Sequence, residues 1–206
     1  MYNLPEYKDH DAARVKAFMK EHPFVMICGV TKDHEPVATQ IPVLIKEDAE
    51  GRMFLYGHMM RSTDHHKAFA GNDAVLAVFT NPAQSYVSAS WYTNPQQGST
   101  WNYMSVHVRG KLHFLDYDGL IEVLRETTAH FENNAASPAS FEHLPQEYID
   151  KLTKAIVAFK IEVLDLQHVF KLSQNRDTKS FENIIEKLES GDPLQKEIAK
   201  EMKLRH

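Results

Sequence analysis

The sequence contains little of what several large protein classes need. Its 206 residues include a single cysteine, Cys28, which excludes an intramolecular disulfide and fits a reducing compartment. No run approaches the ~18 apolar residues of a membrane-spanning helix, and the first residues lack the basic and apolar regions of a signal peptide. We therefore expect a cytoplasmic protein that is neither exported nor inserted in a membrane.

Excess positive charge and the common catalytic motifs are also absent. The net charge is -5 and the pI about 6.2, so direct binding to DNA needs a local basic patch or a partner. The sequence has no G-x-G-x-x-G, Walker P-loop, G-x-S-x-G, H-E-x-x-H or C-x-x-C motif. Twelve histidines are present, but the adjacent His65 and His66 point about 100 degrees apart on a helix, so we expect no metal site.

What is present predicts one mainly β domain. With 43% hydrophobic residues, the chain can bury one substantial core, so we expect a single domain over 1–206 with a helical C-terminal extension at about 177–206. Apolar patterning predicts strands at 24–31, 37–45, 53–56, 74–80, 103–114 and 157–163. Helical spacing predicts helices at 11–22, 67–70 (with Asp64 as N-cap), 117–131, 145–152, 181–188 and 194–202. About six short strands with peripheral helices indicate an α+β fold in which antiparallel strands close into a small barrel.

The clearest alternation lies between Tyr103 and Phe114. One face of this predicted strand carries Met104, Val106, Val108, Leu112 and Phe114. The other carries Tyr103, Ser105, His107, Arg109, Lys111 and His113. Side chains alternate across a strand, so we expect a half-buried strand with a polar, functional face.

Three polar and aromatic clusters fall outside the core pattern. The first runs from Tyr56-Gly57-His58 to His65-His66-Lys67, where a strand leads into a helix and can offer backbone amides and cations to a phosphate. Its alternative is a solvated loop with a surface lysine. The second, between Ser85 and His107, contains both tryptophans beside Ser88, Ser90, Tyr92, Thr100, Asn102 and Tyr103. These rings could flank a planar ligand, or simply cover the barrel or fill a dimer interface.

The third cluster is Lys171-Leu172-Ser173-Gln174-Asn175-Arg176, directly before a predicted helix. It places two cations and three hydrogen-bonding side chains within six residues. Read locally, it is a turn with a helix cap at Asn175 or Asp177.

Together the clusters resemble the PaiB-type FMN-binding proteins, often labelled negative transcriptional regulators, of the flavin-binding split-barrel group. The resemblance covers nearly the whole chain. It is carried by Ala38-Thr39-Gln40-Ile41-Pro42, Tyr56-Gly57-His58, Ser88-Ala89-Ser90-Trp91-Tyr92, Thr100-Trp101-Asn102-Tyr103 with Val106-His107, and Phe170 to Arg176. The order and spacing of the 24–45 hairpin, the Tyr56 strand end and the Lys67 helix are also similar to those of pyridoxine phosphate oxidase-like proteins.

The resemblance implies an antiparallel FMN-binding split β-barrel that forms a homodimer, with flavin in the groove between two barrels. It implies that Lys67 meets the FMN phosphate and that the 171–176 segment completes the site, from the partner chain if the groove requires it. The residues expected to bind FMN are Thr39, Gln40, Ile41, Pro42, Gly57, His58, Lys67, Ser90, Trp91, Trp101, Asn102, His107, Lys171, Ser173, Gln174, Asn175 and Arg176. His65-His66 stands where the oxidases more often have serine and arginine, so we expect FMN binding weakened about tenfold or more and partly empty preparations.

Three functions remain open from the sequence. The first is a flavin-dependent redox protein, in which His107 or Tyr103 is a candidate proton donor and no catalytic residue is assigned. The second is a transcriptional regulator acting on DNA directly or through a partner, although no helix-turn-helix pattern is visible and Lys200, Lys203 and Arg205 are offset by nearby acids. The third is an interaction protein whose barrel has lost its cofactor.

Overall fold

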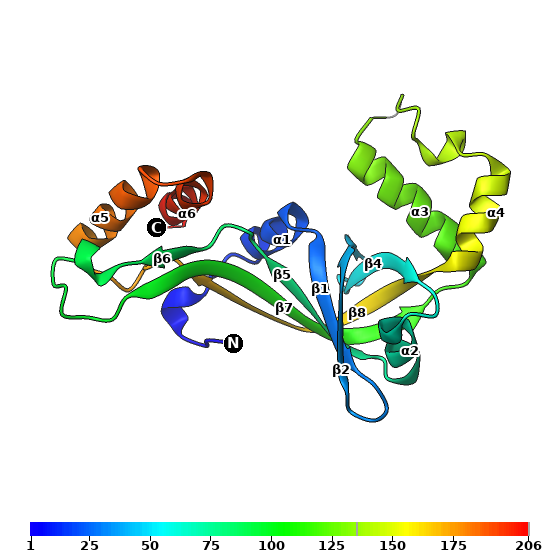
Figure 1. Ribbon diagram of the computed structural model, residues 1–206, viewed down its shortest axis with the longest axis horizontal. Helices are drawn as coiled ribbons and strands as arrows, with labels where there is room; N and C mark the ends of the chain where they lie inside the picture. The colour runs from blue at the N-terminus through cyan, green and yellow to red at the C-terminus, as the bar shows by residue number, and fades with distance from the viewer. Residues whose placement is uncertain (135, 206) are drawn as a thin grey trace. The chain divides into compact units, whose positions relative to one another are not determined.

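The computed structural model describes residues 1–134 and 136–205 (Figure 1). These divide into two compact units, which are described separately. Unit 1 comprises Met1–His22, Phe79–Val106 and Gln167–His206, of which residue 206 is not described. Unit 2 comprises Pro23–Val78 and His107–Leu166, of which residue 135 is not described. Two strands, β7 (Thr100–Phe114) and β8 (Ile156–Lys171), contribute residues to both units.

The β-strands form one antiparallel sheet in the order β2-β1-β5-β7-β8-β4-β3, with β6 (Ser85–Val87) added to β7. The other strands are β1 (Phe24–Val30), β2 (Pro36–Pro42), β3 (Leu44–Glu47), β4 (Met53–Met60) and β5 (Ala74–Thr80). This confirms the predicted mainly β fold with peripheral helices. Within 1–134 and 136–205, the end strands β2 and β3 do not pair with each other, so backbone hydrogen bonds do not close the sheet into a barrel.

The predicted strand at 37–45 is in fact two strands. β2 pairs with β1, with Pro42 opposite Phe24, whereas β3 pairs with β4, with Leu44 opposite Tyr56. Pro42 has no N–H to continue a ladder, and the next amide, Val43 N, donates to Pro23 O at 2.9 Å. The chain therefore leaves one edge of the sheet and starts the opposite edge.

The alternation predicted for 103–114 is confirmed. Met104, Val106, Val108 and Leu112 of β7 are buried, although Phe114 is only half-buried. Ser105, predicted on the polar face, is buried and donates through Oγ to Phe79 O at 3.1 Å. The last strand is much longer than the predicted 157–163, because β8 spans 16 residues.

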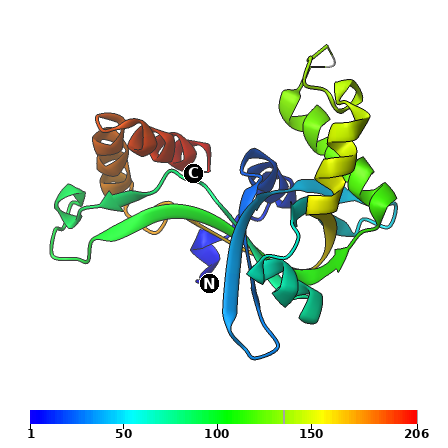
Figure 2. The same cartoon turned by 45° about the vertical axis from the view of Figure 1, so that its right-hand side comes forward.

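The helices of unit 2 lie near the predicted positions. They are α2 (Asp64–Gly71), α3 (Tyr117–Glu132) and α4 (Gln146–Ala155), with a short turn η3 (Phe141–His143) between the last two. In Figures 1 and 2, α3 and α4 lie side by side. Their apolar residues form one core cluster that contains Leu120, Val123, Leu124, Phe141, Ile149, Ile156 and Ala158.

Unit 1 carries the N-terminal and C-terminal helices. These are η1 (Pro5–Tyr7), α1 (Ala12–Glu21), η2 (Ala89–Trp91), α5 (Thr178–Glu189) and α6 (Pro193–Leu204). Phe18 of α1 packs against Phe170 of β8 with ring centroids 5.1 Å apart, and Leu188 and Ile198 are fully buried where α5 meets α6. The predicted C-terminal extension thus belongs to the same compact unit as the N-terminal segment. Among all the residues described, no helix is both long and apolar enough to cross a membrane.

Candidate functional site

The junction between β4 and α2 in unit 2 presents side-chain cations rather than free amides. Thr63, not the predicted Asp64, caps α2, since its Oγ1 accepts from His66 N at 3.3 Å. His65 N donates to Asp64 Oδ1 and Lys67 N to Thr63 O, so three amides expected to face a phosphate already have partners. A phosphate here depends on the side chains.

Two cations and two imidazoles gather at this junction. Arg61 is held by its Nε, which donates to Ile156 O at 2.8 Å. Burial lowers the pKa of His66, and the charges of Arg61, His65 and Lys67 lower it further. His66 Nδ1 accepts from Ser62 N at 3.3 Å, so the proton of the neutral ring is on Nε2 and can be donated. Arg61 was not among the predicted ligands, although it lies inside the same segment.

The predicted residues of β4 have different roles. A Cβ on Gly57 would lie 2.8 Å from the Phe159 ring and 3.1 Å from Pro42 O, so glycine is required for close packing at this point. His58 is half-buried, and burial lowers the pKa of its imidazole. At neutral pH, His58 is therefore an uncharged hydrogen-bonding group.

Residues 39–42 border an exposed apolar face. Ile41 points into the core, whereas Thr39 is half-buried and Gln40 exposed. Directly across the β1–β2 ladder, Phe24 is 59% and Met26 43% exposed. Large apolar side chains left in water at a sheet face indicate a binding surface.

His107, also in unit 2, lies on the half-buried face of β7. Burial lowers the pKa of its imidazole. Two residues further, Arg109 Nη1 forms an exposed ion pair with Asp165 at 2.9 Å. His107 can therefore act as a neutral donor or acceptor near neutral pH.

In unit 1 the structure brings together the second and third predicted clusters. Ser173 Oγ donates to Asn102 Oδ1 at 2.9 Å, and Lys171 Nζ donates to the Thr100 hydroxyl. Arg176 Nη1 donates to Gln97 Oε1 at 2.6 Å. The sequence could not reveal this pairing, because 71 positions separate Ser173 from Asn102.

Several predicted ligands in this cluster serve its internal structure. Gln174 folds back on its own loop: its Oε1 accepts from Leu172 N at 2.7 Å and its Nε2 donates to Phe170 O. Asn102 is fully buried and donates to Met202 Sδ at 3.4 Å. Ser173, Gln174 and Asn102 thus fix the loop, the Asn175 side chain hydrogen-bonds Tyr7, and Lys171 and Arg176 donate to neutral oxygens.

The aromatic residues of unit 1 are partly accessible. Trp101 is 53% exposed and meets Tyr86 edge-on, with centroids 6.0 Å apart. Trp91 is half-buried and its carbonyl accepts from Asn183 Nδ2 at 3.1 Å, while the exposed Ser90 shares a hydrogen bond with Ser88. The N-terminal rings Tyr2 and Tyr7, which sequence reasoning missed, also belong to this unit.

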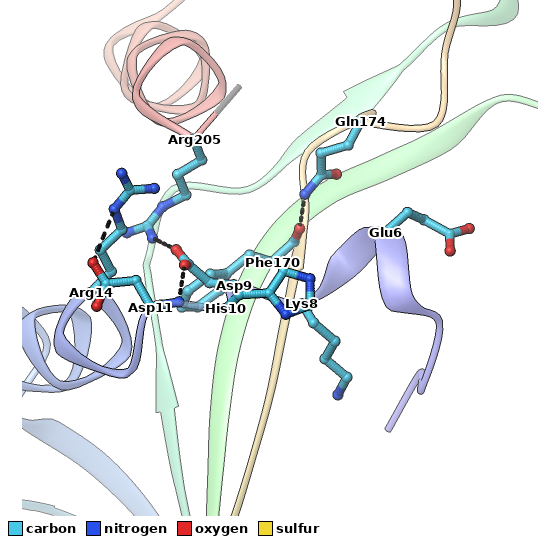
Figure 3. Close-up of a pocket in the computed structure, with 9 residues that line it drawn as sticks. All are labelled: Glu6, Lys8, Asp9, His10, Asp11, Arg14, Phe170, Gln174 and Arg205. Atoms are coloured by element: carbon cyan, nitrogen blue, oxygen red, sulfur yellow. Dashed lines mark hydrogen bonds and ion pairs between the residues drawn. The ribbon is translucent and has the colours of Figure 1, made fainter.

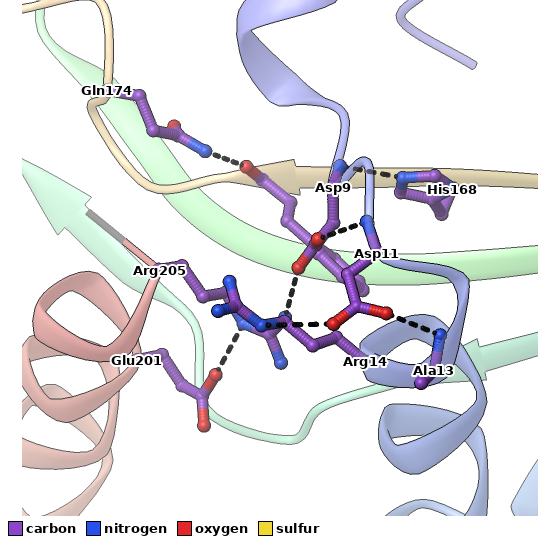
Figure 4. A network of polar contacts seen from close by, with 9 residues as sticks. Asp9, Asp11, Ala13, Arg14, His168, Gln174, Glu201 and Arg205 are labelled. Atoms are coloured by element: carbon purple, nitrogen blue, oxygen red, sulfur yellow. Dashed lines mark hydrogen bonds and ion pairs between the residues drawn. The ribbon is translucent and has the colours of Figure 1, made fainter.

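Unit 1 contains a cavity of about 310 Å³. Its lining residues, drawn in Figure 3, are Glu6, Lys8, Asp9, His10, Asp11, Arg14, Phe170, Gln174 and Arg205. Its buried charges are already paired. Arg205 binds Asp9 through Nη1 and Glu201 through Nε, both at 2.8 Å (Figure 4). Its guanidinium lies 4.5 Å from the Phe170 ring centroid. Asp9 N donates to His168 Nε2 at 2.9 Å. We interpret the Arg205 cluster, which consists of Arg205, Asp9 and Glu201, as a structural contact that holds the N-terminal segment against α6. It is not a reaction centre.

Comparison with known proteins decides the family. Residues 1–165 match the family described as "Putative FMN-binding domain". The chain belongs to this family. A relative from Bacillus subtilis, "Protease synthase and sporulation protein PAI 2", is 31% identical over 203 residues, which cover 98% of this chain and 96% of that protein. The predicted PaiB-type relationship and FMN as the cofactor are thereby confirmed.

Solved structures agree with the fold. A protein from Bacteroides thetaiotaomicron, described as a "putative 5-nitroimidazole antibiotic resistance protein", has a TM-score of 0.56 at 15% identity, covering 78% of this chain and 84% of that one. The FAD and heme binding protein from Mycobacterium smegmatis has a TM-score of 0.57 at 16% identity, covering 79% and 72%. At such identities the likeness establishes the split-barrel fold alone.

Proposed function

We propose that this FMN-binding protein holds the phosphate of its cofactor at the β4–α2 junction of unit 2. Lys67 and Arg61 supply the positive charge, and the neutral rings of His58 and His66 supply hydrogen bonds. The observation that carries the proposal is the placement of these groups where β4 leads into α2: Arg61 is fixed by its bond to Ile156 O, Ser62 N orients the His66 ring, and Lys67 follows His66 in the helix. Two cations and two imidazoles form a donor set that fits a phosphate monoester.

The predicted contacts of unit 2 are part of the same proposal. Residues 39–42 and His107 also contact the cofactor, whereas the unit 1 residues Ser90, Trp91, Trp101, Asn102 and 171–176 are not assigned to it. When bound, FMN supplies electron or hydride transfer to the protein. The chain itself binds and orients the cofactor, so we assign it to the flavin-dependent redox proteins.

A titration of the full chain with FMN, followed by flavin absorbance and fluorescence, tests this assignment. We expect saturable binding, and we expect Lys67→Ala to weaken it about tenfold or more, because one charge-assisted hydrogen bond to the phosphate is lost. Lys111→Ala, which removes an exposed lysine of β7 in the same unit, is the matched control. No flavin binding at any concentration would refute the cofactor assignment, and unchanged affinity in Lys67→Ala would refute the phosphate site.

We also propose that two copies associate through the exposed apolar face of β1, β2 and β5. Phe24 and Met26 lie on it, next to the half-buried Leu76 and Val78. Met26→Lys should shift a dimer toward monomer in light scattering after size exclusion, because a charge would have to be buried at the contact. Tyr117→Lys, at an exposed residue of α3, should leave the mass unchanged. A wild-type monomer at all concentrations would contradict the proposal.

A role in regulation would be indirect. The Bacillus relative carries the name of a protease synthase and sporulation protein. For this chain we propose a cytoplasmic location and an influence on transcription through flavin redox state rather than DNA contact. Specific binding to DNA at physiological salt in a gel-shift assay would favour the alternative, direct regulation.

A further inference from the structure

The two cations of the 171–176 segment have no acidic partner among residues 1–134 and 136–205. Lys171 donates to the Thr100 hydroxyl and lies 5.6 Å from the Tyr2 ring centroid. Arg176 donates to Gln97 and lies 4.2 Å from the Tyr92 ring centroid, while its buried Nε has no hydrogen-bond partner there. Neutral oxygens and ring faces orient a cation without cancelling its charge.

The acids nearest to this pair do not neutralise it. Asp177 follows Arg176, but its carboxylate accepts from Ser180 N, Ser180 Oγ and Thr93 Oγ1 as the cap of α5. Glu6 acts on Tyr7. Burial and the Arg176 charge both lower the pKa of Lys171, so the ammonium is less stable here than in water. A bound anion would remove this unfavourable interaction.

The loop that carries the cations is built before any ligand arrives. Ser173 adopts a left-handed conformation with φ 63°, which a buried hydrogen bond to Asn102 holds in place. Gln174 closes the loop through two further hydrogen bonds. Backbone in this region is costly for a residue other than glycine, and preformed charges bind more tightly because less freedom is lost.

Tyrosines surround the pair with rings and hydroxyl donors. Burial raises the pKa of Tyr7 and of Tyr103, so both hydroxyls stay protonated. The Tyr2 ring centroid lies 5.6 Å from Lys171 Nζ and 6.3 Å from the Tyr7 ring centroid, so both rings lie beside this cation. The charges of Tyr2 and Tyr7 also raise the pKa of Tyr103. Cationic and hydroxyl donors suit an oxyanion, and aromatic walls suit a flat ring.

We propose that Lys171 and Arg176 form a second binding site, which takes the carboxylate or phosphate of a small aromatic compound whose ring lies among Tyr2, Tyr7 and Tyr103. Its residues differ from those proposed to hold the FMN phosphate. The aromatic anion would be a substrate of the flavoprotein, and this role as substrate rests on the proposed function. Anion binding itself does not.

Isothermal titration of the full chain with phenyl phosphate, with and without saturating FMN, tests the site. We expect equal binding in both states and at least tenfold weaker binding of inorganic phosphate, which has no ring. Lys171→Met and Arg176→Gln should each weaken phenyl phosphate at least tenfold and leave FMN affinity unchanged. Lys171→Arg, which keeps the charge, should retain binding, and Lys179→Met removes an exposed unit 1 lysine as the control.

The outcomes separate this site from the flavin site. Lys67→Ala should lose FMN affinity and keep phenyl phosphate. Competition between FMN and phenyl phosphate, or loss of FMN affinity in Lys171→Met, would show that the pair holds the cofactor and would overturn the proposal. Absence of phenyl phosphate binding to the folded wild-type chain would overturn it as well.

Discussion

Gly110 lies where β7 packs closely against β8. A Cβ on Gly110 would lie 2.3 Å from Glu162 O and 2.6 Å from Ile161 Cγ2. Neither a backbone oxygen nor a packed β-branched side chain can move away cheaply. Glycine at this position is therefore a packing requirement rather than a source of flexibility.

We expect Gly110→Ala to lower the free energy of unfolding by about 1–3 kcal/mol, because the strands must separate to admit the methyl group. Urea unfolding followed by circular dichroism measures the effect. Gly98→Ala is the matched control, since its Cβ would meet nothing within 4 Å. Equal stability of the two variants would show that β7 and β8 are packed less closely at Gly110 than the structure indicates.

The Arg205 cluster makes a second prediction at the residue scale. The side chains of Arg205, Asp9 and Glu201 are only 13%, 9% and 10% exposed. Arg205→Ala leaves two buried carboxylates without their cation, so we expect a loss of about 3–5 kcal/mol in the free energy of unfolding. Thermal and urea unfolding measure this loss.

Arg52→Ala is the control for that variant, because its pairs with Asp48 and Glu50 are exposed and such pairs contribute little. If Arg205→Ala were as stable as Arg52→Ala, the ion pairs of the Arg205 cluster would not hold the N-terminal segment in place.

At the scale of elements, the helix α6 depends on a capping box. Asp192 Oδ1 accepts from Gln195 N at 2.9 Å, and Gln195 Oε1 accepts from Asp192 N at 3.0 Å. Asp192→Ala should reduce the free energy of unfolding by about 1 kcal/mol, and Asp192→Ser should restore most of it. Glu197→Ala, at a more central position of the same helix, should change it by less than about 0.5 kcal/mol. A full loss in Asp192→Ser would contradict the capping role.

The elements also show how far local sequence reaches. Helices with a clear apolar stripe, such as α3 and α5, lie where the spacing predicts them. The break at Val43 was missed, because apolar alternation continues through it and only the pairing with Pro23 reveals it. The cap of α2 was placed one residue late, since Thr63 and Asp64 are both good cap residues.

The candidate site was only partly predictable for the same reason. Motifs locate Lys67 and the 171–176 segment, but the partners of that segment, Thr100 and Gln97, lie more than 70 positions away. Which side chains build the loop and which remain available is decided by these distant contacts. Tyr2 and Tyr7 carry no local signal of a site, and Arg61 lies inside the first predicted cluster but was not predicted as a ligand.

At the scale of the whole molecule, histidines in both units link stability to pH. Burial lowers the pKa of His22 and His168 in unit 1 and of His58 and His66 in unit 2. The unfolded chain then takes up protons near pH 6.5 while the folded chain still resists them. The free energy of unfolding should therefore be fully present above pH 6.5 and should fall as pH drops through 6.5 toward the lower pKa values of the folded state.

His168 permits a specific test, because its Nε2 must be unprotonated to accept from Asp9 N. His168→Gln can supply an oxygen to the same amide but takes up no proton. Between pH 7 and 5, the free energy of unfolding of this variant should therefore fall less steeply than that of wild type, and the two slopes should differ by up to about 1.4 kcal/mol per pH unit. His10→Gln, at an exposed residue of the same segment, should follow the wild-type curve. Parallel curves for His168→Gln and wild type in urea unfolding across this range would show that His168 takes up its proton equally in both states.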